Sequence, residues 1–215
     1  MSPNDLLLSS LRSAHLLPSP IIPATFTPRL DLVIAYPSGL VPQQGNIARV
    51  GQVSQRPRIY VSNPPPPESS NVTYTFMMID PDAPTPEDAK YAYWRHWVVT
   101  SISGAAGTGG GGGGGASLDG NEDEDITARG TTLTPYLAPG PKDESGPHRY
   151  LFLLFEEKDE AGGLDKADVG GDEFVERRSF RAEEVVERKE LKLVGVQWMR
   201  GVGDGWKGEE EKKEL

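Results

Sequence analysis

The sequence predicts a mostly β protein, an antiparallel β-sandwich with a few small peripheral helices. Short runs rich in β-branched and aromatic residues recur along the chain, bounded by proline, glycine or asparagine. Long helical patterns do not separate most of these runs, which favours antiparallel neighbours over crossover connections. The length of 215 residues suits one domain with a sizeable core, together with flanking arms.

Six segments are expected to form strands, and they lie at residues 30–36, 58–61, 72–79, 96–102, 149–155 and 191–199. The third strand is apolar at four consecutive positions, Phe76 to Ile79. A run that is apolar on both faces is typical of a strand covered on both sides of its sheet. We therefore expect this strand to lie in the centre of the fold.

Two helices are expected, one before the first strand and one between the last two strands. Ser2 and Asp5 have the spacing of a capping box, and Pro18 ends the helical pattern that follows. The apolar face of this N-terminal helix needs a covering surface, either the sandwich itself or a groove in a partner. The second helix follows Ser179, the expected N-cap, and Glu184 and Arg188 have the spacing of an exposed ion pair on it.

The chain divides into three parts at the level of sequence. Residues 1–19 form an amphipathic arm, residues 20–200 the domain, and residues 201–215 a charged tail. The domain is interrupted at 105–125 by an insertion of glycine and acidic residues. Such a segment has too little apolar surface to offset the entropy lost on ordering, so we expect it to be flexible.

Composition excludes several classes of function. Acidic residues number 32 and basic residues 22, giving a net charge of -10, which disfavours general binding to nucleic acid. The absence of cysteine excludes disulfides, thiolate zinc sites and thiol catalysis, and favours a reducing, cytoplasmic location. No run of about 18 apolar residues is present to span a membrane.

Candidate site residues gather at strand ends. His96 and His148 each stand where an expected strand begins, and the strand at 72–79 runs into Asp80-Pro81-Asp82-Ala83-Pro84. A second proline-stiffened corner, Pro139-Gly140-Pro141, precedes His148. Each residue alone fits a turn or a surface position. Together they point to a site, because strand ends hold polar groups rigidly near solvent.

The chemistry of that site has two readings from the residues. One is a metal-dependent enzyme using His96, His148 and either Asp80 or Asp82, since two histidines and a carboxylate can bind a metal. The other is a small anion pocket with imidazole and backbone N–H donors. A nucleophile elbow of the G-x-S-x-G type and a Walker phosphate loop are both absent.

Three blocks of sequence resemble a known family. They are residues 74–84, ending in Asp-Pro-Asp-Ala-Pro, residues 93–99, and residues 146–156, which contain Gly-Pro-His-Arg-Tyr. In this order they resemble the phosphatidylethanolamine-binding protein family, which includes inhibitors of carboxypeptidase Y and of Raf kinase. The resemblance spans residues 20–200, and the N-terminal helix makes a fungal-type member the better match. It implies a β-sandwich with a shallow anion pocket.

The resemblance also implies site residues and partners. The ligand-binding residues would be Asp80, Asp82, Pro84, Tyr91, His96, Gly140, Pro141, His148 and Tyr150. Arg95 and Lys142 depart from the family, which often has histidine and proline at these positions.

The implied function is non-enzymatic, with no catalytic residue, cofactor or metal ion. The pocket would hold a small anion or a phospholipid head group, and the protein target would be a serine protease of the carboxypeptidase Y type or a kinase. We expect a monomer that can contact a membrane peripherally. A pure protein-interaction module with a vestigial pocket is a further alternative.

Overall fold

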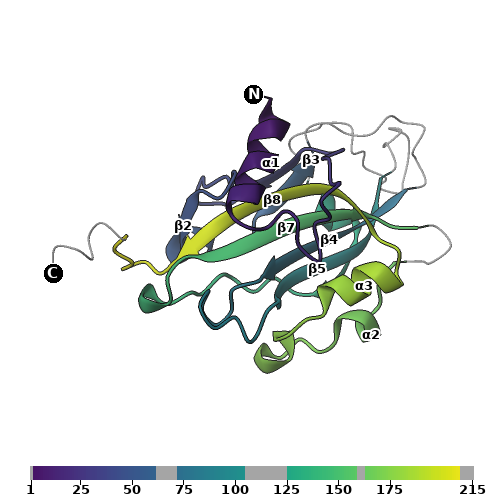
Figure 1. The fold of residues 1–215 in the computed structure, drawn as a ribbon. Coiled ribbons are helices and arrows are strands. Elements are labelled where there is room, and N and C mark those ends of the chain that lie inside the picture. The colour runs from purple at the N-terminus through teal and green to yellow at the C-terminus, as the bar shows by residue number, and fades with distance from the viewer. Residues whose placement is uncertain (1, 62–71, 105–124, 159–162, 209–215) are drawn as a thin grey trace.

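The strands of the protein form one large and one small sheet. A computed structural model describes residues 2–61, 72–104, 125–158 and 163–208. Among these residues the strands are β1 (Leu32–Ala35), β2 (Ile47–Arg49), β3 (Arg58–Val61), β4 (Thr73–Asp80), β5 (Trp94–Ser103), β6 (Thr131–Thr134), β7 (His148–Glu156) and β8 (Lys192–Val202). The helices are α1 (Pro3–Ser13), α2 (Lys166–Val169) and α3 (Ala182–Arg188) (Figure 1).

The large sheet has the order β2-β8-β7-β4-β5-β6, and β1 pairs with β3 in the small one. The pairs within it are antiparallel, as expected from the sequence, except that β2 runs parallel to β8. The mostly β class is therefore confirmed. The six expected strands are present, and their ends lie within three residues of the predicted ones. The short strands β2 and β6 were not predicted from the sequence.

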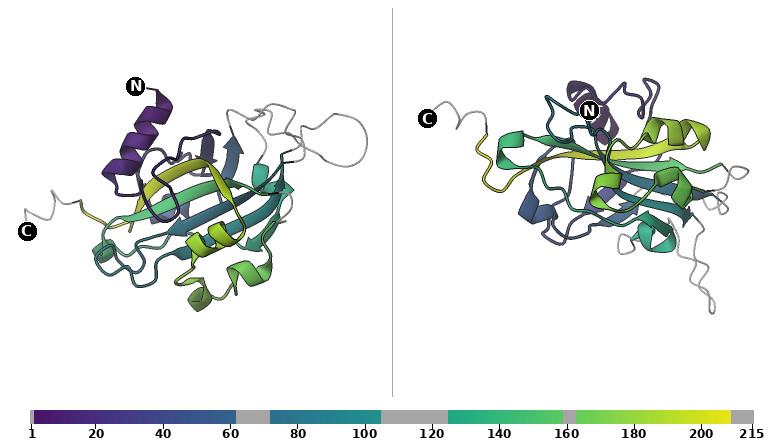
Figure 2. Two further views of the ribbon diagram at one scale, coloured as in Figure 1. Left: turned by 45° about the vertical axis from the view of Figure 1, so that its right-hand side comes forward. Right: turned by 90° about the horizontal axis from the view of Figure 1, so that it is seen from below.

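Both faces of the large sheet are covered, which explains the apolar run in β4. Met77 and Ile79 belong to one buried cluster, with residues of α1 and α3, while Phe76 and Met78 belong to the other, with residues of β1 and β3. Figure 2 shows the two helices on one side of the sheet and the small sheet on the other. Alternate side chains of a strand point to opposite faces, so a strand covered twice is apolar at every position.

The N-terminal helix packs on the domain itself. The capping box of Ser2 and Asp5 is present, and Leu7 and Leu11 are buried against the sheet. Trp198 of β8 donates a hydrogen bond from Nε1 to Ser10 Oγ at 3.0 Å. Of the two surfaces that could cover this helix, the sandwich is therefore the one that does so.

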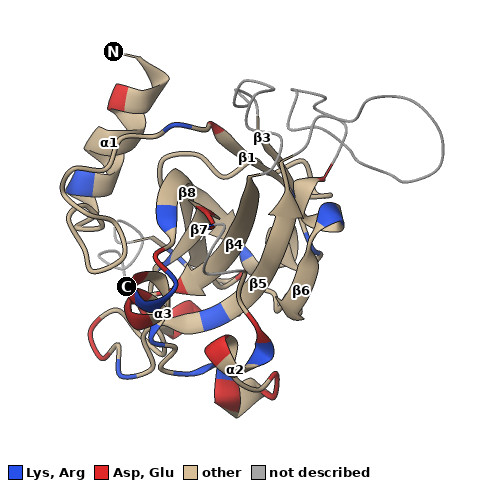
Figure 3. Ribbon diagram, turned by 90° about the vertical axis from the view of Figure 1, so that its right-hand side faces the viewer, with Lys and Arg blue, Asp and Glu red and all other residues tan. Residues whose placement is uncertain are grey.

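The late helix begins later than the sequence indicated. Its N-cap is Arg181 rather than Ser179, whose φ of 51° places it in the left-handed region. The expected pair within α3 is also replaced: Glu184 bonds Arg181, and Arg188 reaches Asp168 of α2 at 2.7 Å. Charged residues consequently gather around α2 and α3, in contrast to the almost uncharged central strands (Figure 3).

The ends of the domain differ from the sequence-based boundaries. Strand β8 continues to Val202, and Arg49 donates a hydrogen bond to the carbonyl of Asp204 at 2.8 Å, so the fold extends past the predicted limit at residue 200. Asp125, the last residue of the predicted insertion, is buried and accepts a hydrogen bond from the backbone N–H of Ile59. The rest of that insertion, residues 105–124, and the tail at 209–215 lie outside the described residues.

Candidate functional site

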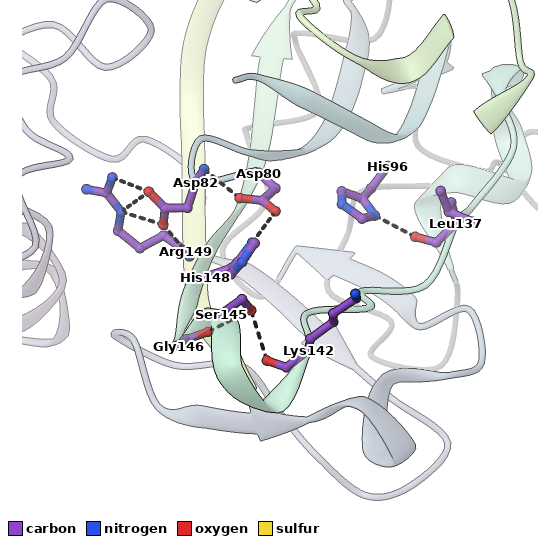
Figure 4. Close-up of polar contacts among 9 residues, drawn as sticks. All are labelled: Asp80, Asp82, His96, Leu137, Lys142, Ser145, Gly146, His148 and Arg149. Atoms are coloured by element: carbon purple, nitrogen blue, oxygen red, sulfur yellow. Dashed lines mark hydrogen bonds and ion pairs between the residues drawn. The ribbon is translucent and has the colours of Figure 1, made fainter. Parts of the chain in front are cut away.

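The centre of the site is an ion pair between two adjacent strand ends. Strand β4 ends at Asp80 and β7 begins at His148, and these strands are antiparallel neighbours in the sheet. The Nδ1 atom of His148 lies 2.8 Å from Asp80 Oδ2, and both side chains are buried (Figure 4). The other oxygen, Asp80 Oδ1, accepts a hydrogen bond from the backbone N–H of Asp82 at 2.7 Å. Both carboxylate oxygens are thus engaged inside the protein.

This pairing sets the protonation of His148. Burial lowers the pKa of the imidazole, but the hydrogen bond and the negative charge of Asp80 outweigh it, with smaller contributions from Asp82 and the backbone of Pro84. The net result is a pKa raised above the usual value for histidine. The Nε2 atom is buried and has no hydrogen-bond partner among the described residues. When His148 is charged, Nε2 carries a proton that it can donate to a ligand.

The second aspartate has a structural role. Asp82 Oδ2 accepts hydrogen bonds from the backbone N–H of Arg149 at 2.7 Å and from its Nε at 2.9 Å. Nη1 of Arg149 then donates to the carbonyl of Ala14, just after α1, at 2.8 Å. Asp82 therefore points away from the pocket and joins the acidic corner to the N-terminal arm.

His96 reaches the pocket through a β-bulge. In the pairing of β4 with β5, Met78 lies opposite Trp97 and Ile79 opposite Arg95, so His96 is the extra residue. A bulge redirects side chains, because two residues of one strand then oppose a single residue of the other. His96 Nδ1 lies 2.7 Å from the carbonyl of Leu137, whose backbone N–H donates in return to the His96 carbonyl at 2.8 Å. The bulge is held in place by this reciprocal pair of bonds.

The two histidines differ in charge. Burial lowers the pKa of His96, and it outweighs the opposing effects of Asp80 and the Leu137 carbonyl. The neutral ring donates from Nδ1 to Leu137, which leaves a lone pair on Nε2. The sequence led us to expect both imidazoles to donate to an anion. In the structure His148 has an Nε2 without a protein partner that can donate when the ring is charged, whereas His96 presents an acceptor at neutral pH.

Tyr150 contacts the rings of both histidines. Its ring is nearly parallel to that of His148, with an interplanar angle of 16°, and meets His96 edge to face at a centroid distance of 5.2 Å. Burial raises the pKa of its hydroxyl, with further contributions from the charges of Asp80 and Asp82, so the phenol stays neutral. A side chain at Gly201 on β8 would collide with the Tyr150 ring, so glycine at this position lets the ring lie where it does.

These groups line one pocket with a volume of about 510 Å³. Every site residue implied by the family resemblance lines it except Asp82: Asp80, Pro84, Tyr91, His96, Gly140, Pro141, His148 and Tyr150. Asp82 instead borders a smaller cavity beneath α1. The loop from Leu137 to Ser145 closes the side of the pocket opposite the acidic corner.

Among the lining residues that were not singled out from the sequence, three carry large aromatic or charged side chains from other elements. Trp94 opens β5, and Phe174 and Arg178 come from the segment before α3. Trp94 lies next to the departure at Arg95, which could have drawn attention to it. No local signal in the sequence placed Phe174 or Arg178 beside the pocket, since they lie about 80 residues from Trp94.

The alternative of a metal-dependent enzyme needs a group of residues that can coordinate a metal ion. Within the described ranges, no group of three or more His, Cys, Asp or Glu side chains lies close enough to hold a metal ion. His148 Nδ1 and His96 Nδ1 are each engaged by other protein atoms.

Among the described residues, no helix is long and apolar enough to cross a membrane.

Comparison with known proteins identifies the family. The sequence model of the phosphatidylethanolamine-binding protein family matches residues 36–194, which is most of the chain. The chain belongs to the phosphatidylethanolamine-binding protein family.

Solved structures agree with this membership. A carboxypeptidase Y inhibitor, solved in complex with its cognate proteinase, has a TM-score of 0.69 at 20% identity, covering 94% of this chain and 97% of its own. The phosphatidylethanolamine-binding protein from Plasmodium vivax has a TM-score of 0.68 at 25% identity, covering 92% of this chain and 97% of its own. A homologue from Plasmodium falciparum has a TM-score of 0.62 at 22% identity, covering 90% of this chain and 96% of its own. The sandwich fold and the family expected from the sequence are both confirmed.

Proposed function

We propose that this member of the phosphatidylethanolamine-binding protein family is a non-enzymatic regulator whose pocket binds a phosphate group. The phosphate would belong to a small anion or to the head group of a phospholipid. The observation that carries the proposal is the buried, unpartnered Nε2 of His148 at the wall of the pocket. A buried donor without a partner costs about 1–3 kcal/mol, a cost that a bound anion removes.

The geometry assigns different tasks to the residues of the pair. His148 donates from Nε2 to a phosphate oxygen, and its positive charge strengthens that bond. Asp80 does not face the anion with a free oxygen, because its two oxygens bind His148 and the backbone of Asp82. It orients the imidazole and favours its charged form, as the partner carboxylate of a functional histidine does.

The proposed protein target is a serine protease of the carboxypeptidase Y type. Support comes from the likeness to the inhibitor that was solved with its proteinase, which extends over nearly the whole of both chains. This chain shares the fold of that structure. The kinase alternative has no observation of its own in the described residues.

Histidine NMR tests the pocket directly. Inorganic phosphate is titrated into the protein while the ring signals of all three histidines are followed. His148 and His96 should shift together, whereas His15, which is exposed just after α1, serves as an internal control. If His148 and His96 stay unchanged at saturating phosphate, the pocket is vestigial and the interaction-module alternative is correct.

An inhibition assay tests the target. Purified protein is added to carboxypeptidase Y and, as a matched control, to a serine endopeptidase such as trypsin. We expect concentration-dependent inhibition of the carboxypeptidase and none of trypsin. Full carboxypeptidase activity at a large excess of this protein would remove the protease from the proposal and leave anion binding untouched.

A further inference from the structure

Unpartnered buried nitrogens converge on the pocket from three residues. Among the described residues, Trp94 Nε1, His148 Nε2 and Arg178 Nε are each buried without a hydrogen-bond partner. All three residues line the same pocket. Buried polar groups in native structures are nearly always satisfied, so such a convergence indicates a ligand that supplies acceptors. Only His148 belongs to the pair described above, which leaves Arg178 and Trp94 to be explained.

Arg178 is held in place by aromatic rings rather than by a carboxylate. Its guanidinium carbon lies 4.5 Å from the ring centre of Tyr91, 5.6 Å from Trp94 and 6.0 Å from Phe174. The rings support one another, since Trp94 meets Phe174 edge to face at 4.8 Å and Tyr91 at 6.4 Å. We call these three residues the aromatic cluster. Stacking on ring faces fixes a guanidinium while leaving its N–H groups free to donate.

The backbone brings Arg178 to this cluster. The N–H of Ser179 donates to the carbonyl of Tyr91 at 3.0 Å, and the N–H of Phe180 donates to that of Tyr93 at 2.9 Å. These bonds tie the segment before α3 to the turn before β5. Arg178 is thereby anchored next to the ring on which it stacks.

Of the other cations near the pocket, Arg177 and His148 are already bound to protein partners, and Lys142 is exposed at the rim. Arg177 donates to the carbonyls of His96, Pro135 and Asp172, and the charge of His148 is balanced by Asp80. Lys142 lies 4.0 Å from Glu144 at the exposed rim. Arg178 forms no ion pair or side-chain hydrogen bond with any residue of the described ranges, so its donors are available.

Charged groups also face Arg178 from behind. Arg178 also lines a second cavity, whose other charged residues are Arg95, Asp168, Glu176, Arg181, Glu184 and Arg188. Arg181 pairs with Glu184, and Arg188 pairs with Asp168. Glu176 accepts a hydrogen bond from the backbone N–H of Glu173. These groups largely satisfy one another, and none lies within ion-pair distance of Arg178.

We infer that Arg178 is the second phosphate-binding residue of the pocket and contributes a charge that persists when His148 is neutral. This inference rests on the proposed function, because it assigns a further donor to the same ligand. Trp94 Nε1 adds a neutral donor beside it. Since arginine stays protonated at any physiological pH, phosphate binding has one component that depends on pH and one that does not.

The test measures binding of dimethyl phosphate by calorimetry at pH 6.0 and 8.5. This phosphodiester carries a single fixed negative charge, so only the protein titrates. The groups that face His148 are Asp80, Asp82, His96 and Tyr150, and those near Arg178 are named above. We expect R178Q to weaken binding about 10- to 100-fold at both pH values, the range for a charge-assisted hydrogen bond. H148Q should weaken binding at pH 6.0 and have little effect at pH 8.5.

The matched control is R181Q. Arg181 lies three residues after Arg178, forms an exposed ion pair with Glu184 and does not line the pocket, so R181Q removes the same charge outside the site. It should bind as the wild type does. Phe174→Leu removes one ring of the cluster and keeps the charge, and it should weaken binding by less than R178Q. Circular dichroism and thermal unfolding of each variant show whether the fold is retained.

The outcomes separate the two proposals. If the wild type binds dimethyl phosphate and R178Q binds equally well, or if R181Q is weakened as much as R178Q, the assignment of Arg178 is wrong while the pocket stands. If the wild type binds no phosphate compound at either pH, the proposed function and this inference both fail. Inorganic phosphate and glycerophosphoethanolamine, compared as further probes, distinguish a free phosphate from a lipid head group. If glycerophosphoethanolamine binds more tightly than inorganic phosphate and R178Q abolishes this difference, Arg178 binds the head group.

Discussion

Replacing Asp80 by asparagine should flatten the pH dependence of anion binding, so that the affinity curve of the variant crosses that of the wild type. Asp80 Oδ1 accepts a hydrogen bond from the backbone of Asp82, so the asparagine oxygen must occupy that position. Its amide nitrogen then faces His148 Nδ1, which in the wild type lies 2.8 Å from Asp80 Oδ2. The amide nitrogen can only donate, so Nδ1 of His148 becomes an acceptor and the proton of the neutral ring moves to Nε2.

The magnitude follows from the type of donor that the anion meets. Below the raised pKa of wild-type His148, Nε2–H belongs to a charged ring, whereas in D80N it belongs to a neutral one. Hydrogen bonds to charged groups contribute about 1.5–3 kcal/mol and neutral ones about 0.5–1.5, so D80N should bind about 5-fold more weakly at low pH. Above that pKa, wild-type His148 keeps its remaining proton on Nδ1 and turns a lone pair to the anion. D80N retains its donor there and should bind more tightly than the wild type.

Calorimetric titration of dimethyl phosphate from pH 5.5 to 8.5 measures both curves, which should cross. H148Q is the control, since it lacks the imidazole and should show neither the low-pH gain nor a crossing. Parallel curves for D80N and the wild type would refute the reasoning, because Asp80 would then not control the proton on His148. Loss of all binding in D80N, with the fold intact, would equally refute it.

Three further predictions concern stability. Leu11→Ala should destabilise the protein by about 2–5 kcal/mol in urea unfolding, because Leu11 is completely buried, while Leu6→Ala on the same helix, at 42% exposure, should change it by less than about 0.5. Equal effects would mean that α1 does not pack as described. Thermal unfolding between pH 5 and 8 should separate the histidines. His148, with its raised pKa, stabilises the fold below about pH 6.5 and loses this effect as the pH rises. H148Q should therefore lower the thermal stability most at pH 5. His96, with its lowered pKa, opposes folding as the pH falls below about 6.5, so H96Q should lower the thermal stability least at pH 5. Identical pH profiles for the two variants would contradict the two pKa directions. Replacing residues 105–124 by a short turn should change stability by less than about 1 kcal/mol, since closure entropy varies slowly with loop length, and a loss of several kcal/mol would overturn this.

The arm and the acidic corner are coupled through Arg149. Its guanidinium joins Asp82 to the carbonyl that follows α1, and Asp82 in turn donates its backbone N–H to Asp80. The pocket and the N-terminal helix are therefore linked by three consecutive polar contacts. A sequence pattern could not reveal this link, because its members come from residues 14, 80–82 and 149.

Much of the site followed from the sequence alone. Asp80 directly follows a run of apolar residues and His148 directly precedes one, so each had to stand at the end of a buried strand. The period of two within β4 and β7 then determined which side chains enter each core. Local order of this kind can be predicted because it depends on neighbours along the chain.

Tertiary structure decided the rest. His96 faces the pocket only because of a bulge against Met78 and Ile79, and strand periodicity cannot show where an extra residue is accommodated. Ser179 looked like a helix cap, but its N–H bonds Tyr91 and the helix begins later. That same bond carries Arg178 to the aromatic cluster, about 80 residues away in sequence. Contacts of this kind depend on how separate segments pack, so the residue types alone leave them undetermined, whereas the packed fold fixes them.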